Sequence, residues 1–189
     1  MYKIMKYIFL SLIIAFLFHF DVAAQASTDG HFLVEFEKFT PPAQALIKSF
    51  EGHIAEQFLA NDVNGKEHYL PDYKGKNVIL WFWSTDNAVA LEQVGAMTLL
   101  QQRNDNLKII SFAKEPKARV LEYLRQNPME IDVIPNGEIF GQMAYGADMG
   151  NPRMFIIDEF GIIKAALPVE AFADNSKLLI SLESILNGL

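Results

Sequence analysis

The sequence predicts an α/β domain in which a mixed central β-sheet is flanked by helices. Two largely apolar runs, 77–83 and 107–113, have the composition of central strands, and the first is continuous enough to indicate burial on both faces. An amphipathic helical stretch separates these runs, as in a strand–helix–strand unit with parallel strands. Farther along the chain, 153–158 and 162–166 flank a turn at 159–161 and predict an antiparallel hairpin. A parallel unit beside an antiparallel hairpin makes the sheet mixed.

Two elements are predicted ahead of the first central strand. Thr40-Pro41 is typical of a helix N-cap followed by proline at the first helical position, and Gly52 ends that helix. Asn64-Gly65 then lies between the extended runs 55–59 and 66–70. Because Asn-Gly favours a tight turn, this segment predicts a β-hairpin.

Helices are predicted where apolar residues recur every three or four positions between the strands. Ala90, Val94, Met97 and Leu100 mark the helix between the two apolar runs. The remaining predicted elements, in chain order, are a helix opened by Glu115-Pro116 and ended by Asn127-Pro128, a short extended piece at 131–134, a helix at 138–145, and a last helix that starts near Asp174-Asn175.

Charge and residue usage exclude several functions. The chain has 189 residues, enough for one domain, with 16 basic against 23 acidic side chains and a net charge of −7. This balance offers no electrostatic surface for nucleic acid or anionic lipid. The absence of cysteine excludes disulfides, thiolate nucleophiles and Cys-ligated metals. His31, His53 and His68 are scattered, so we expect no metal site, and the lack of a glycine-rich phosphate motif predicts no cofactor.

The first residues have the pattern of a secretory signal. Lys3 and Lys6 precede an apolar run at 7–20, which is shorter than the ~20 residues that a membrane-spanning helix needs. Small residues follow in the A-x-A pattern, so we expect a signal peptide at 1–26, with cleavage after Ala24 as the alternative. An uncleaved anchor stays open as a second interpretation. With the signal removed, we expect an exported, periplasmic or cell-envelope protein with no membrane span.

Several short strings occur in an order and spacing that resemble the thioredoxin fold. They are Ala55-Glu56-Gln57-Phe58, Asn64-Gly65-Lys66, Leu70-Pro71-Asp72-Tyr73-Lys74-Gly75-Lys76, Leu80-Trp81-Phe82-Trp83, Tyr145-Gly146, Gly150-Asn151-Pro152 and Phe155-Ile156-Ile157-Asp158-Glu159-Phe160-Gly161. The chain is most similar to exported thiol–disulfide oxidoreductases of the TlpA/ResA type and to their AhpC/TSA, or redoxin, relatives. The resemblance implies a thioredoxin-like domain at 52–189, preceded by an N-terminal extension at 27–51.

The resemblance also shows where this chain departs from the family. A W-C-x-x-C motif follows the tryptophan-containing strand in that family, and its two cysteines fall on Asn87 and Ala90 here. If the peroxiredoxin pattern T-x-x-C is used instead, Thr85 matches and the cysteine falls on Ala88. Neither alignment supplies sulfur. Asn87 is suited to cap the helix, and Trp81 replaces an acid or amide of the family, so we expect a packing and capping site.

Gly150-Asn151-Pro152 matches the cis-proline loop of the family, which implies a cis bond before Pro152 and a backbone that pairs with a bound strand. Arg153 follows, either to hold an acidic partner or as a solvated charge at the strand end. The candidates for peptide binding are therefore Asn151, Pro152, Arg153, Asp86 and Trp83.

The resemblance without its cysteines implies an exported, redox-inactive domain, not an enzyme, that binds a peptide or protein partner at the cis-proline loop. Two alternatives stay open. One is a decayed oxidoreductase paralogue kept as a structural subunit. The other is an enzyme that uses a different chemistry in the same cleft, with Asp86, Thr85 or Arg153 contributing.

Overall fold

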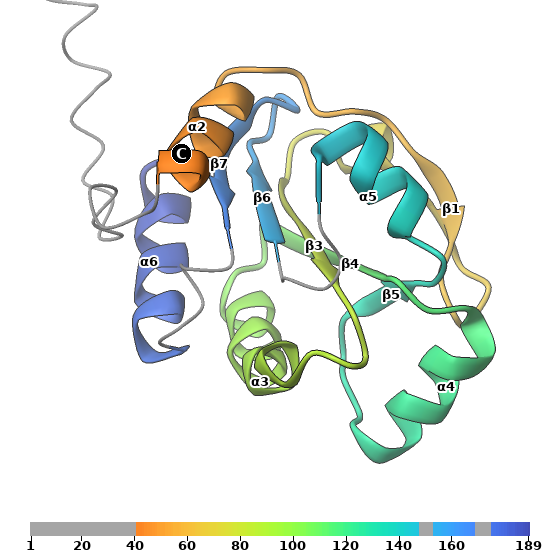
Figure 1. Ribbon diagram of the computed structural model, residues 1–189. Helices are drawn as coiled ribbons and strands as arrows, with labels where there is room; N and C mark the ends of the chain where they lie inside the picture. Colours follow the sequence, from red (N-terminus) through yellow and green to blue (C-terminus); the bar gives the residue numbers. More distant parts are fainter. Residues whose placement is uncertain (1–40, 148–152, 169–174) are drawn as a thin grey trace, which may run out of the picture. The chain divides into compact units, whose positions relative to one another are not determined.

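The protein is described by a computed structural model over residues 41–147, 153–168 and 175–189. A five-stranded sheet forms its centre, in the order β5-β4-β3-β6-β7 (Figure 1). The three strands β3, β4 and β5 are parallel, and β6 and β7 are antiparallel to their neighbours, which confirms the predicted mixed sheet. The strands are β3 (Asn77–Trp83), β4 (Leu107–Ala113), β5 (Asp132–Ile134), β6 (Arg153–Ile157) and β7 (Ile163–Leu167).

Helices cover both faces of this sheet. Helices α3, α4 and α6 pack against one face, and α2 and α5 pack against the other. Among the described helices, none combines the length and the apolarity needed to cross a membrane. The helices are α2 (Pro41–Phe50), α3 (Ala88–Arg103), α4 (Lys117–Gln126), α5 (Glu138–Tyr145) and α6 (Asn175–Asn187), with a short 3-10 helix, η2 (Leu70–Tyr73).

Strand β3 explains why the run NVILWFW is apolar without interruption. Successive side chains of a strand point to opposite faces, and both faces of β3 are covered. Ile79, Trp81 and Trp83 belong to the core beneath α3, α4 and α6. Leu80 and Phe82 belong to the core beneath α2 and α5.

The predicted hairpin is present but begins later than expected. Strands β1 (Leu59–Asn61) and β2 (Glu67–Tyr69) pair antiparallel around a turn with Gly65 at φ 87°. The prediction of a strand over 55–59 was wrong. The backbone there is used elsewhere, because the amide of Ala55 donates to the carbonyl of Gly161 at 2.9 Å.

Helix α2 falls within the predicted extension at 27–51 but packs on the sheet. The Phe50 ring meets the Phe155 ring edge-on at 5.0 Å and stacks near Tyr145. Residues 41–50 therefore contribute to the same core as the rest of the domain. The predicted signal at 1–26 and the start of the extension lie outside the described residues.

Candidate functional site at the start of helix α3

The predicted degenerate site lies where β3 passes into α3. Strand β3 ends at Trp83, and Asn87 is the N-cap of α3, with extended backbone angles. Its side-chain Oδ1 accepts a hydrogen bond from the amide of Val89 at 2.9 Å. This confirms the capping role predicted for Asn87. Ala90, in the first turn of the helix, is fully buried, so the two positions provide a cap and a packing contact.

Glu115 holds the turn between β3 and α3 in place. The Ser84 hydroxyl donates to Glu115 Oε1 at 2.6 Å, and the Thr85 amide donates to Glu115 Oε2 at 3.1 Å. The Ser84 hydroxyl also accepts from the Asp86 amide at 3.2 Å. Sequence reasoning missed Glu115. Its position shortly after β4 could have indicated this role. Neighbouring parallel strands end at the same edge of a sheet, so a residue that follows β4 lies near the turn that follows β3.

The two tryptophans of β3 lie in the core. Both are fully buried, and their rings stack at 5.6 Å. The packing role predicted for Trp81 is therefore confirmed. Trp83 was predicted to contact a bound peptide. This prediction was wrong, because the ring has no exposed surface.

Several polar atoms are buried without a partner on this side of the sheet, within the part of the chain that the structure describes. The two indole N–H groups and the side-chain amide of Gln93 have no hydrogen-bond partner among the described residues. The Tyr123 ring lies 5.3 Å from that of Trp83, and burial, followed by the charge of Glu115, raises the pKa of its hydroxyl. Gln93 and Ala90 are both buried on the inward face of α3. A polar residue on an otherwise apolar helix face could have indicated these buried polar atoms, but sequence reasoning did not single out Gln93.

Arg153 begins β6, directly opposite Phe82 on β3. This register places it at the same sheet edge as the turn that precedes α3. Its side chain is half-buried, and its Nε and Nη1 are buried without a hydrogen-bond partner among the described residues. Arg153 is therefore not a fully solvated charge at the strand end, which was one of its two predicted roles. Asn151 and Pro152, including the predicted cis bond, lie outside the described residues.

Asp86 is the exposed member of the predicted set. Its carboxylate lies 3.7 Å from Arg119 Nη2, with 79% and 53% of the two side chains exposed. An ion pair this exposed contributes little to stability, because water and salt screen it. Asp86 is thus available at the surface of the edge that Arg153 also borders.

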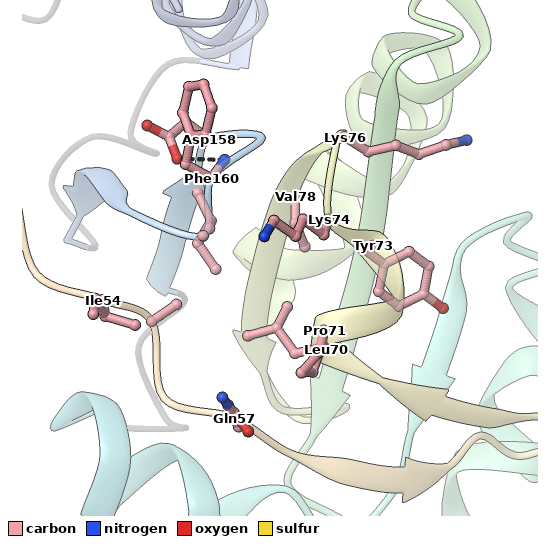
Figure 2. A pocket seen from close by; sticks show the side chains of 13 residues that line it. Ile54, Gln57, Leu70, Pro71, Tyr73, Lys74, Lys76, Val78, Asp158 and Phe160 are labelled. Carbon is pink, nitrogen blue, oxygen red and sulfur yellow. Dashed lines mark hydrogen bonds between the residues drawn. The ribbon is translucent and has the colours of Figure 1, made fainter.

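The opposite sheet edge carries a separate pocket of about 190 Å³ (Figure 2). Ile54 and Phe160 line one part of it, and Leu70 and Pro71 of η2 line another. Val78 at the start of β3 also lines it, whereas the candidate site follows the end of β3. None of the residues predicted to bind a peptide lines this pocket.

The sequence profile of the AhpC/TSA family matches residues 51–166, more than half of the chain. The chain belongs to the AhpC/TSA family. Among curated AhpC/TSA relatives, the thiol-disulfide oxidoreductase ResA of Geobacillus thermodenitrificans is 28% identical over 116 residues, which are 60% of this chain and 66% of ResA. The thioredoxin-like protein YneN of Bacillus subtilis is 28% identical over 123 residues, 60% of this chain and 69% of YneN. The chain thus spans slightly less than two thirds of ResA.

Solved structures show the fold of this AhpC/TSA member. The thioredoxin domain of a thiol-disulfide oxidoreductase from Bacteroides vulgatus superposes with a TM-score of 0.61 at 17% identity, over 72% of this chain and 98% of that one. A thiol:disulfide interchange protein from a Bacteroides species superposes with a TM-score of 0.59 at 16% identity, over 73% and 91%. The predicted thioredoxin-like fold is confirmed.

Proposed function

We propose that this AhpC/TSA member is exported and binds a peptide or protein partner in the cell envelope without thiol chemistry. The proposed binding surface, called the α3 edge below, consists of the turn Ser84–Asn87 and Arg153. A thiol at a helix N-terminus is activated by unpaired N–H groups and the helix dipole. In the register of the family resemblance, Asn87 and Ala90 occupy the cysteine positions, so this helix start has a cap where relatives have a nucleophile.

Arg153 carries the binding part of the proposal. A guanidinium has five N–H donors and no acceptor, and a buried donor without a partner costs free energy. Two donor nitrogens of Arg153 are in this state among the described residues. A carboxylate or backbone carbonyl of a bound partner would satisfy them, and a carboxylate would do so with a charge-assisted bond.

The turn that follows β3, at the same end of the sheet as Arg153, supports binding because it is already ordered. Glu115 accepts from both Ser84 and Thr85, and Asn87 caps the helix that follows. A surface that is fixed before binding loses less conformational entropy when a partner docks. Asp86 lies within this ordered turn and its side chain is exposed. A probe at this position would contact a partner docked on the turn.

Export is supported by the signal pattern at 1–26. Its test is the mass of the protein recovered from the cell envelope. A chain that starts at residue 27, or at residue 25, supports removal of a signal peptide. A full-length chain recovered from the cytoplasm contradicts export.

Site-specific photo-crosslinking tests the α3 edge. A photo-reactive amino acid replaces Asp86 in one variant and Asp105 in the control, which is also exposed but precedes β4 at the other end of the parallel strands. We expect a discrete adduct in living cells from position 86, none from position 105, and loss of the adduct when Arg153→Gln is added. Equal labelling at both positions, or no adduct at either, contradicts binding at the α3 edge and favours the structural-subunit alternative.

A further inference from the structure

The structure brings together one histidine and two carboxylates that are far apart in the sequence. Asp62 lies just after β1, His68 is the middle residue of β2, and Asp132 begins β5 at the edge of the central sheet. The amide of Val63 donates to the carbonyl of Val133 at 2.9 Å, which ties the hairpin to that strand. Because the three residues come from different elements, the spacing of histidines along the chain did not indicate the cluster.

The three candidate ligand atoms have separations that suit one metal ion. His68 Nε2 lies 3.5 Å from Asp62 Oδ2 and 3.7 Å from Asp132 Oδ2, and all three atoms lie within 4.8 Å of one another. Ligands about 2.1 Å from a tetrahedral ion are separated from each other by about 3.4 Å. The His68 contacts are longer than a good hydrogen bond and close to this tetrahedral edge.

Two of the three side chains are held by their other polar atom. His68 Nδ1 lies 2.6 Å from the Tyr73 hydroxyl, and Asp62 Oδ1 accepts from the amides of Asn64 at 2.8 Å and Lys66 at 2.9 Å. These contacts leave His68 Nε2 and Asp62 Oδ2 facing the centre of the cluster. Metal-binding histidines and carboxylates are oriented by contacts of this kind.

His68 supplies the observation that points to a ligand. Its side chain is fully buried, and Nε2 has no hydrogen-bond partner among the described residues although it faces two carboxylates. The Asp62 side chain is 1% exposed and that of Asp132 is 20% exposed, so the cluster is shielded but open to solvent on the Asp132 side. A cation at the centre would bond Nε2 and be balanced by the two carboxylates.

Two lysines neutralise the cluster without a metal ion. Lys108 Nζ lies 2.5 Å and Lys66 Nζ 3.2 Å from Asp132 Oδ2. The Lys66 side chain is 58% exposed and is able to turn into solvent, whereas that of Lys108 is only 18% exposed. Both ammonium groups contact the same Oδ2 that is assigned to the cation, so an incoming cation has to displace Lys66, the more exposed of the two, and to share Asp132 with Lys108.

We propose that Asp62, His68 and Asp132 form a binding site for one divalent transition-metal ion, with Zn²⁺ as the ion that their geometry and donor atoms fit. Imidazole nitrogen and carboxylate oxygen are both Zn²⁺ ligands, and the remaining tetrahedral position is left for solvent. The site lies on the hairpin side of the domain, so it is independent of the α3 edge.

Calorimetric titration of the tag-free full chain with Zn²⁺ tests this site, with Co²⁺ absorption as a second readout of tetrahedral ligands. We expect one ion per chain, an affinity lowered at least about tenfold by His68→Ala and by Asp62→Asn, and an unchanged affinity in the control His53→Ala, whose side chain is exposed elsewhere. Lys66→Ala should raise the affinity, because it removes the competing ammonium.

If His68→Ala does not fold, the Lys66→Ala variant still tests the site. Lys66 is at the surface, so its replacement should leave the fold intact while it changes the affinity for Zn²⁺. Absence of saturable binding in the wild-type chain, or binding that neither Asp62→Asn nor Lys66→Ala changes, overturns the proposal. The cluster is then an ion-paired structural contact only.

Discussion

Replacing Arg153 by methionine tests whether Arg153 serves binding at the expense of folding stability. If it does, the variant should lose partner binding without losing free energy of unfolding. Methionine keeps a flexible, unbranched side chain of similar reach but removes the charge and all N–H donors. An unpartnered buried donor costs about 1–3 kcal/mol, and Arg153 has two such nitrogens among the described residues. The substitution also removes the solvated part of a half-buried side chain, so only part of that cost is recovered. We therefore expect the free energy of unfolding to stay equal or to rise by up to about 1 kcal/mol.

Urea denaturation followed by tryptophan fluorescence measures this effect, because Trp81 and Trp83 are the only tryptophans and both are fully buried. Arg119→Met is the matched control. Its guanidinium makes exposed ion pairs, so its loss should change stability by less than about 0.5 kcal/mol. A loss of more than about 1 kcal/mol in Arg153→Met would mean that the guanidinium already has hydrogen-bond partners within the chain, contrary to this expectation.

Four further outcomes are expected. Asn87→Ala should cost about 1 kcal/mol of unfolding free energy in urea, because it removes the cap of α3. Glu115→Ala should cost about 2–4 kcal/mol in the same assay, because Ser84 and Thr85 both lose a charged acceptor. Tyr145→Phe should cost about 1 kcal/mol at neutral pH, through loss of the hydrogen bond to the backbone carbonyl of Glu56 at 3.1 Å. Insulin reduction and peroxide consumption by the purified protein should equal the buffer blank, because the chain has no thiol.

The Tyr145 variant also has a pH signature. Burial, followed by the charge of Glu56, raises the pKa of the Tyr145 hydroxyl far above its ordinary value. Above a pH of about 10 the unfolded chain therefore ionises this group while the folded chain does not, and the wild type loses stability as the pH rises. The Tyr145→Phe variant lacks this loss, so the difference between the two should shrink above that pH. A difference that grows with pH would contradict the assignment.

Each of the other three expectations can be contradicted by a specific result. An Asn87→Ala variant as stable as the wild type would mean that water caps α3 equally well. For Glu115→Ala, the comparison is Glu122→Ala, which removes an exposed carboxylate next to Arg119, and equal stability of the two variants would remove the locking role of Glu115. Turnover in either redox assay, in a preparation free of contaminating oxidoreductases, would contradict the redox-inactive part of the proposal.

Local patterns were sufficient to predict the central elements. The runs at 77–83 and 107–113 are largely apolar because helices cover both faces of the sheet, and the observed strands have these bounds. Helix ends were predictable where one residue decides them. Asn87 caps α3 through its own side chain, and Gly52, two residues after the end of α2, lies in the left-handed region at φ 80°.

Contacts between distant segments were not predictable in the same way. The bond from Ser84 to Glu115 spans 31 residues and depends on β3 and β4 ending at one edge. The approach of His68 to Asp132 depends on the hairpin lying beside β5, which no local pattern specifies. The early strand predicted over 55–59 is absent because only Ala55 and Phe58 are buried there, three positions apart, and the amide of Ala55 donates to the carbonyl of Gly161 in the turn before β7.

Photo-crosslinking from position 86 after thiols are blocked measures thiol-independent binding at the α3 edge. Cell-envelope extract is treated with N-ethylmaleimide and then mixed with the purified protein that carries the photo-reactive residue in place of Asp86. We expect a discrete adduct whose yield is unchanged by thiol blocking and is lost when Arg153→Gln is added. An adduct that disappears when thiols are blocked, or one that persists undiminished in Arg153→Gln, would contradict thiol-independent binding at the α3 edge.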